Sequence, residues 1–362
     1  MKRRIGISLY PNHSDLKKDL EYIDKVATLG YERVFMSMLE LGDDYEEILD
    51  KFKTTIMACR NKGLEVMLDV APDIFAKLGV DFDDLSLFAK LGAHGLRLDA
   101  GSNGQKEAMI SFNQDGLIIE LNMSNDVAYL DNILTYKANK PFLYGCHNFY
   151  PQNDTGLDYD FFIKCSERFK KEGIKTAAFV SSLVGDVGPW SVNDGLPTLE
   201  MHRKMPLYIQ AKHLFATGLI DDVIIGNAYA SDEELEALAN INRYQLEFEV
   251  EINSNNNEVE NEIMFKEQHF RRGDVTANMI RSTEVRKKYI NVDNKEHDHL
   301  ETLSKGDIVI GNNGFGKYKN ELQVVLKPHT NDLKNKVGRV IAEEVFLLDY
   351  VDAWTKFKLT RG

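Results

Sequence analysis

The chain of 362 residues has only three cysteines and eight prolines. Cys59, Cys146 and Cys165 form no CxxC pair and no even-numbered set, which argues against a disulfide-stabilised scaffold and favours a reducing compartment. With eight prolines and 25 glycines, the chain cannot be collagen-like or proline-rich. Apolar residues make up 43%, as in an ordinary globular protein.

Long hydrophobic runs are missing as well. No stretch approaches the roughly 18 apolar residues that a membrane span needs. The basic opening MKRR is followed only by IGISLY before Pro11, which is too short for the apolar region of a secretory signal. We therefore expect a cytoplasmic protein that does not associate with membranes.

Positive charge is in deficit, with 44 Lys and Arg against 57 Asp and Glu and a formal net charge of −13. This balance argues against binding nucleic acid or an anionic membrane through bulk charge. A local basic pocket for one phosphate group remains allowed. The sequence leaves the oligomeric state open.

Short apolar runs alternate with amphipathic stretches over the first two thirds of the chain. Each interval between runs suits one helix and two loops, which is the size of a βα unit. Eight such units predict a (β/α)8 TIM barrel over residues 1–243. An open doubly wound sheet has the same local pattern, but no glycine-rich dinucleotide turn follows the first run. The runs are 5–9, 33–37, 65–70, 95–99, 117–123, 142–149, 175–180 and 222–227.

The texture changes near residue 245. Alternating polar and β-branched segments such as GDIVIGNNG and LQVVLKP follow to the end of the chain. This pattern is typical of strands and predicts a smaller, β-rich second domain over residues 244–362.

Chemistry in a barrel sits at the carboxyl ends of its strands. Strand alternation predicts that Asp69, Asp99 and Glu120 point inward from three neighbouring strands. Converging carboxylates can act as general acid, base or nucleophile, and their proximity should raise at least one pKa. The alternative is an internal ion-pair layer in which Arg97 neutralises Asp99 and Glu120.

Other polar and aromatic side chains should lie near the same mouth and bind substrate. Trp190 could stack on a sugar face or pack its loop down. His147 could be an acid, a metal ligand or a hydrogen-bonding group. Metal hydrolases on barrels usually show His-x-His on the first strand, which SLYPNHS lacks, so we predict no catalytic metal and no cofactor. The substrate-binding candidates here are Tyr10, Arg97, Asn122, His147, Asn148, Trp190 and Asn227.

Several long motifs resemble those of the bacterial 6-phospho-N-acetylmuramidases, whose relatives also carry the older label "outer surface protein". The resemblance extends over the whole chain and implies a cyclophilin-like second domain. It implies cytoplasmic hydrolysis of the β-1,4 bond of N-acetylmuramic acid 6-phosphate–N-acetylglucosamine, a step of peptidoglycan recycling. The motifs are GLRLDAG, LIIELNMSND, GCHNFYPQ, GPWSVNDGLPTLEMHR and AKHLFATGLIDDVIIGNAYAS.

A phosphorylated substrate requires cations or backbone donors. The segment HFRRGDVTANMIRSTEVR in the second domain is rich in arginine. If this domain caps the barrel mouth, Arg281 and Ser282 could grip the phosphate. A solvated basic face is the alternative reading of these arginines.

Two other function classes stay open at this point. The first is a non-catalytic carbohydrate-phosphate binding or surface protein, which the missing secretory signal and the three mouth carboxylates disfavour. The second is a metal-dependent sugar-phosphate isomerase, which also uses carboxylates on a barrel.

Overall fold

The structure is a computed structural model that describes residues 1–39, 45–298, 302–330 and 333–362. The chain divides into two compact units, Met1–Ile241 and Asn242–Gly362. This division falls two residues before the boundary expected between 243 and 244. Each unit is built around its own buried core.

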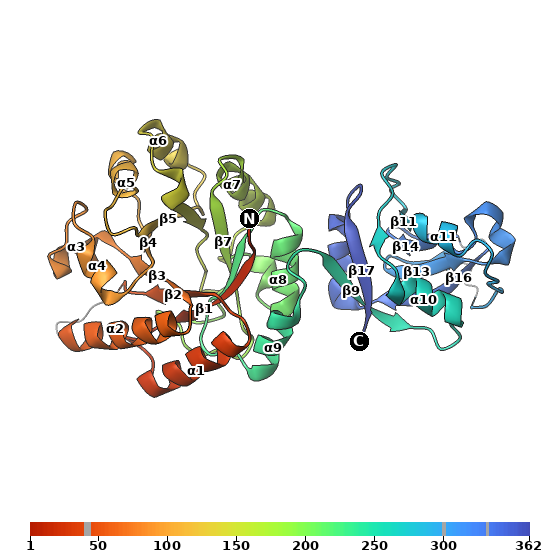
Figure 1. Ribbon diagram of the computed structural model, residues 1–362, viewed down its shortest axis with the longest axis horizontal. Coiled ribbons are helices and arrows are strands. Elements are labelled where there is room, and N and C mark those ends of the chain that lie inside the picture. Colours follow the sequence, from red (N-terminus) through yellow and green to blue (C-terminus); the bar gives the residue numbers. More distant parts are fainter. Residues whose placement is uncertain (40–44, 299–301, 331–332) are drawn as a thin grey trace. The chain divides into compact units, whose positions relative to one another are not determined.

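The described part of the first unit is a closed barrel of eight parallel strands in sequence order, with β1 paired to both β2 and β8 (Figure 1). The predicted TIM barrel is therefore confirmed, and every predicted apolar run overlaps one barrel strand. The strands are β1 Arg4–Leu9, β2 Arg33–Ser37, β3 Glu65–Val70, β4 Gly95–Leu98, β5 Ile118–Asn122, β6 Leu143–Cys146, β7 Lys175–Val180 and β8 Asp222–Ile225.

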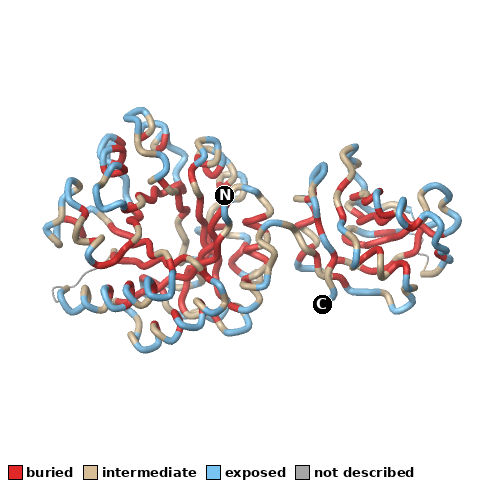
Figure 2. Tube along the Cα trace, in the orientation of Figure 1, coloured by how far each residue is buried: buried red, intermediate tan, exposed pale blue. Residues whose placement is uncertain are grey.

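Helices connect the strands and surround the barrel (Figure 1). Helix α1 begins after Asp15, whose side chain accepts a hydrogen bond from the Lys18 amide at 3.0 Å, and it buries Ile23 and Val26. Figure 2 shows that burial is concentrated on the strands. The helices are α1 Leu16–Thr28, α2 Tyr45–Asn61, α3 Pro72–Leu78, α4 Ser86–Leu91, α5 Gln105–Ile110, α6 Tyr129–Thr135, α7 Tyr159–Lys171, α8 Leu207–Ala216 and α9 Asp232–Asn240, with short 3₁₀ turns η1 Lys140–Phe142 and η2 Glu200–His202.

Charged side chains fill the amino-terminal end of the barrel interior. Arg33, the first residue of β2, is 1% exposed and forms ion pairs with Glu120 and with Asp222, the latter at 2.6 Å. Arg4 donates to Asp222 at 3.0 and 2.7 Å and to Glu65 at 2.8 Å. We call Arg4, Arg33, Glu65, Glu120 and Asp222 the ion-pair layer. Because these charges are desolvated, each depends on its partners.

Aromatic packing fills another part of the barrel interior. The rings of Phe35 and Phe179 meet edge to face with centroids 5.1 Å apart, and Phe149 lies 5.0 Å from Phe179. Tyr10 is buried beside them and donates its hydroxyl hydrogen to the carbonyl of Gly226.

The second unit is mostly sheet, as predicted. Its described strands form a seven-stranded sheet in the order β10-β17-β9-β16-β13-β14-β11 and a small pair β12-β15. One face of the larger sheet buries Phe248, Ile280, Leu322 and Val324. The elements are β9 Leu246–Ile252, α10 Glu258–Lys266, β10 His269–Phe270, β11 Met279–Ser282, α11 Glu284–Lys288, β12 Thr302–Leu303, β13 Asp307–Gly311, η3 Asn313–Tyr318, β14 Leu322–Val325, β15 His329–Thr330, β16 Lys334–Val340, η4 Ala342–Tyr350 and β17 Lys356–Arg361.

Within the ranges that the structure describes, no helix has the length and apolar character to cross a membrane.

The ion-pair layer leads to a stability prediction. Glu120→Gln leaves Arg33 buried with half of its charge partners, so it should lower the free energy of unfolding by about 3–5 kcal/mol. Asp126→Asn, which removes a surface carboxylate paired with Lys164 and Arg168, is the matched control and should change it little. Urea unfolding measures both. Equal stability of Glu120→Gln and wild type would contradict this role.

Candidate active site

The carboxyl ends of β3 and β4 bring two aspartates to one arginine. Asp69 precedes the last residue of β3, and Asp99 directly follows β4. Arg97, the register partner of Asp69 on β4, donates from Nη1 to Asp69 Oδ1 at 2.5 Å and to Asp99 Oδ1 at 3.2 Å. Its Nη2 donates to the side-chain oxygen of Asn148 beyond β6. One guanidinium therefore bridges two carboxylates and an amide at the barrel mouth.

The two carboxylates differ in environment. Asp69 is 1% exposed, whereas the Asp99 side chain is 42% exposed. Burial raises the pKa of Asp69 to about 7, with the negative charge of Asp99 adding to the effect and the Arg97 guanidinium opposing it. A buried acid with this pKa can hold a proton near neutral pH and give it up in a reaction. Such a difference between neighbouring carboxylates is typical of an acid and its partner in catalysis.

A small cavity opens on these groups. Its volume is about 70 Å³, and Asp69, Arg97, Asp99 and Asn148 provide its polar lining. Leu39, Phe149 and Trp190 complete the wall. The Trp190 side chain is 43% exposed, and its ring centroid lies 6.2 Å from that of Phe149. An aromatic side chain beside carboxylates suits a ligand with one apolar and one polar face.

A second, smaller cavity of about 10 Å³ shares Leu39 and Trp190 with the first. Of the predicted residues, only Tyr10 and Trp190 line it. Sequence reasoning did not select Ser37, yet Ser37 ends β2 as Asp69 nearly ends β3, so the same strand-end rule would have found it. The rest of this wall is formed by Asn12, His13 and Pro189.

The structure does not bring Glu120 to the mouth, where it was expected. Glu120 is fully buried and pairs with Arg33 in the ion-pair layer. Two residues further along β5, Asn122 reaches the rim and donates from Nδ2 to the Asp99 carbonyl at 3.3 Å. Part of the ion-pair alternative is therefore present: Arg97 pairs with Asp99, as that alternative expected, but Glu120 pairs with Arg33 and not with Arg97.

His147 and Asn227 also lie away from the cavity. His147 is fully buried, with Nδ1 3.1 Å from Ser124 Oγ and Nε2 2.9 Å from Ser166 Oγ, and burial lowers its pKa to about 3. Asn227 donates from Nδ2 to the carbonyls of Ser182 and Gly185. Both side chains therefore hold the scaffold around the mouth.

Barrels frequently bind phosphate with the loops after β7 and β8 and a helix amino terminus. In this chain the Glu234 carboxylate occupies donors of these loops. It accepts hydrogen bonds from Ser182 Oγ at 2.6 Å, from the Leu183 amide at 2.8 Å and from the Ser231 amide at 3.1 Å. Arg203 is 6% exposed and donates to Glu200 at 2.7 Å and to the Tyr150 carbonyl at 3.0 Å. The donors named here are therefore engaged within the chain.

The two residues expected to grip phosphate in the second unit are separated by strand alternation. Arg281 and Ser282 are successive residues of β11, so their side chains point to opposite faces of the sheet. Ser282 Oγ is buried at 3.0 Å from Nδ1 of His269, whereas Arg281 donates to Glu321. The structure does not bring Arg281 and Ser282 together.

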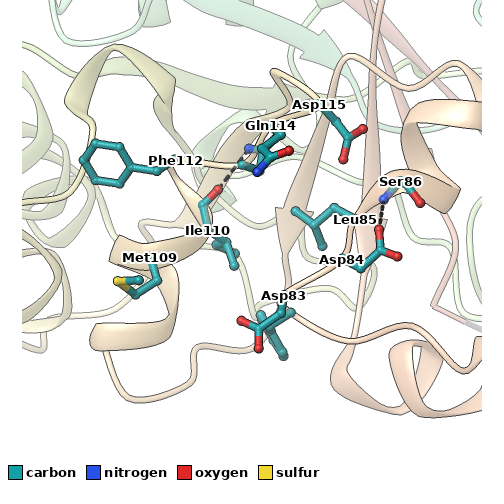
Figure 3. Close-up of a pocket in the computed structure, with 11 residues that line it drawn as sticks. Asp83, Asp84, Leu85, Ser86, Met109, Ile110, Phe112, Gln114 and Asp115 are labelled. Atoms are coloured by element: carbon teal, nitrogen blue, oxygen red, sulfur yellow. Dashed lines mark hydrogen bonds between the residues drawn. The ribbon is translucent and has the colours of Figure 1, made fainter.

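A larger cavity of about 460 Å³ lies outside the barrel, between the segment that leads into α4 and the end of α5 (Figure 3). Asp83, Asp84 and Asp115 line it, and the Asp84 carboxylate accepts from the Ser86 amide at 2.9 Å. None of the predicted site residues lies in it. Across residues 1–39, 45–298, 302–330 and 333–362, no three His, Cys, Asp or Glu side chains are grouped so as to hold a metal ion.

The fold and the mouth together define a class: a TIM-barrel protein with a carboxylate site at its strand ends and a second, sheet-based unit. The family follows from comparison with known proteins. The model described as "6-phospho-N-acetylmuramidase, N-terminal" matches residues 5–240, and the corresponding C-terminal model matches residues 246–360. The chain belongs to this family, which confirms the resemblance seen in its motifs.

Two solved structures are similar over nearly the whole chain. An uncharacterized B. cereus protein is 54% identical, with a TM-score of 0.93 over 99% of this chain and 100% of its own. A conserved Enterococcus faecalis protein of unknown function is 25% identical, with a TM-score of 0.72 over 99% of this chain and 96% of its own. No functionally curated protein matches the chain.

The site leads to a prediction about titration. Carbon-13 NMR of the aspartate carboxyls should show Asp69 titrating near pH 7. Asp99→Asn should lower the pKa of Asp69 for two reasons: it removes a nearby negative charge, and Asp69 becomes the only carboxylate of this pair that binds Arg97 Nη1. Asp83→Asn, in the cavity outside the barrel, should leave it unchanged. A wild-type pKa near 4 for Asp69 would contradict the interpretation.

Proposed function

We propose that this protein is a glycosidase that hydrolyses the β-1,4 bond of N-acetylmuramic acid 6-phosphate–N-acetylglucosamine. Membership of the 6-phospho-N-acetylmuramidase family supports the substrate. The observation that carries the chemistry is the Asp69–Arg97–Asp99 group, in which a buried acid with a pKa of about 7 lies beside an exposed carboxylate. Glycosidases use such a pair.

In this proposal Asp69 is the general acid. Its proton passes to the glycosidic oxygen as the bond to the muramyl C1 breaks, so that N-acetylglucosamine leaves as a neutral alcohol. Arg97 holds both carboxylates in place. As Asp69 loses its proton, the adjacent guanidinium stabilises the new negative charge.

Asp99 is then the nucleophile. Oδ1 of Asp99 and Oδ1 of Asp69 accept hydrogen bonds from the same nitrogen, Arg97 Nη1, at 3.2 and 2.5 Å. The separation of these two oxygens cannot exceed the sum of the two distances, which is less than the roughly 6.5 Å at which the carboxyl separations of inverting glycosidases begin. The spacing therefore favours attack of Asp99 on C1 and a covalent glycosyl-enzyme. Water activated by ionised Asp69 releases the muramyl sugar with its β configuration retained.

The remaining wall of the cavity suits a sugar. Trp190 and Phe149 offer aromatic surface to the apolar face of a pyranose, and the Asn148 side chain lies among the carboxylates. The family name implies a phosphorylated muramyl substrate, and a muramyl sugar is a fragment of the bacterial cell wall. We accordingly propose a cytoplasmic role in peptidoglycan recycling.

The test uses a chromogenic N-acetylmuramide 6-phosphate. Asp69→Asn and Asp99→Asn should each lower kcat by at least ~10²-fold, the usual scale for acid–base groups. Asp83→Asn, which changes a carboxylate outside the barrel, should keep wild-type kcat. Activity should also survive exhaustive chelation.

Each contrary outcome selects another function. Tight binding of the phosphorylated sugar without hydrolysis indicates a non-catalytic binding protein. Loss of activity on chelation that a divalent metal restores indicates the metal-dependent isomerase class. Proton NMR of the first product checks the stereochemistry: a muramyl sugar released as the β anomer agrees with the proposal, and the α anomer contradicts the role of Asp99.

A further inference from the structure

Two arginines of the second unit converge on one buried carboxylate. Arg281 on β11 donates to Glu321 from Nε at 2.8 Å and from Nη2 at 3.2 Å. Arg286 on α11 donates from Nη1 to Oε2 of Glu321, the oxygen that also accepts from Arg281 Nη2. Glu321 is fully buried, and the Arg281 and Arg286 side chains remain 22% and 18% exposed. Figure 1 shows α11 beside β11 and β14.

This cluster lies on the face of the sheet opposite the main core. Ile280 and Ser282, which flank Arg281, are buried on the core side. Gln323 on β14 is the register partner of Arg281, so both side chains project from the same face. The ring of Tyr318 adjoins both guanidinium groups, with its centroid 5.7 Å from Cζ of Arg281 and 5.0 Å from Cζ of Arg286.

The cluster carries surplus positive charge. Lys317 also lies over the Tyr318 ring, at 5.1 Å. In the described part of the chain, Glu321 is the carboxylate that forms ion pairs with Arg281 and Arg286. Asp274, which also acts on Arg281, is itself paired with Arg272. Arg281 Nη1 and Arg286 Nε and Nη2 have no partner among the described residues.

Gln323 adds a second, independent sign of a ligand. It is 5% exposed and donates from Nε2 to Glu321 Oε1 at 3.0 Å, which fixes its amide orientation because the oxygen would be repelled there. Its Oε1 is buried and has no hydrogen-bond partner among the described residues. A buried acceptor without a partner is costly, and a ligand hydroxyl or N–H would satisfy it.

In the described part of the barrel unit, the groups considered above for phosphate binding are already engaged within the chain. Arg97 is committed to Asp69, Asp99 and Asn148, Arg203 to Glu200 and main-chain carbonyls, and Glu234 fills the loops after β7 and β8. Paired guanidinium donors match the oxygens of a phosphate, whose charge is close to −2 near neutral pH.

We propose that the second unit binds the phosphomonoester group of a hydroxylated small molecule, a sugar phosphate, at Arg281 and Arg286. Their spare N–H groups bind the phosphate oxygens, and Gln323 Oε1 accepts a hydrogen bond from a ligand hydroxyl. The identification of the ligand as a sugar phosphate rests on the proposed function. The binding of phosphate itself rests only on the cluster.

Calorimetric titration of the full chain with inorganic phosphate and with glucose 6-phosphate tests the site. Wild type should bind both, and glucose 6-phosphate more tightly. Arg281→Lys with Arg286→Lys keeps the charge beside Glu321 but removes the forked donors, so it should weaken phosphate binding by about 10-fold. Arg272→Gln with Asp274→Asn, which removes a neighbouring exposed ion pair, is the matched control and should bind as wild type does.

Two further variants keep the proposal falsifiable if the lysine variant is unstable. Arg281→Gln with Arg286→Gln and Glu321→Gln removes the cluster's charges together, so it leaves no buried charge unpaired and should abolish phosphate binding. Gln323→Leu should keep phosphate binding but lose the preference for glucose 6-phosphate. Thermal unfolding of each variant shows that it is folded.

No phosphate binding by wild type, or undiminished binding by the folded variants without Arg281 and Arg286, overturns the proposal. An unchanged preference in Gln323→Leu overturns the role of Gln323. Hydrolysis assays on the same samples separate the two proposals. Phosphate binding at the cluster without muramide hydrolysis refutes the proposed glycosidase activity and supports the phosphate site. Muramide hydrolysis without phosphate binding at the cluster supports the glycosidase activity and refutes the phosphate site.

Discussion

The bridge from Arg97 to Asp69 and Asp99 is the interaction on which the rest of the site depends. Desolvation alone would hold Asp69 protonated well beyond neutral pH, and a strong ion pair alone would hold it ionised. Burial, Arg97 and Asp99 together bring its pKa to about 7. The same guanidinium fixes the spacing of the two carboxylates and, through Asn148, ties β3 and β4 to the loop after β6.

A second arginine, Arg33, pairs with the other buried carboxylates of the barrel interior. Because Arg33 forms ion pairs with Glu120 and Asp222 at the amino-terminal end of the barrel, Arg97 can pair with the two aspartates at the mouth. This division separates stability from chemistry, as is general for this fold. It also leaves Arg97 bound to Asp69, Asp99 and Asn148.

Much of this arrangement follows from the sequence. The spacing of the apolar runs predicts every barrel strand, and alternation along β3 and β4 predicts that Asp69 and Asp99 face inward. Alternation gives the face of a strand but not the height of a residue in the barrel or its partner. Glu120 was expected at the mouth for this reason, since its pairing with Arg33, 87 residues away, has no local signal. Likewise, the run Arg281–Ser282 looks like one basic motif, but the sheet sends its side chains to opposite faces.

The central claim is that Asp69 donates a proton to the leaving group. The most direct measurement compares Asp69→Asn with wild type on two 6-phosphomuramides, the natural disaccharide and an aryl glycoside whose leaving group departs without protonation, such as dinitrophenol. A general acid matters only where the leaving group needs a proton, so kcat/KM should fall by at least ~10²-fold on the disaccharide and change little on the dinitrophenyl substrate. Equal losses on both substrates would show that Asp69 acts in some other way and would contradict the account.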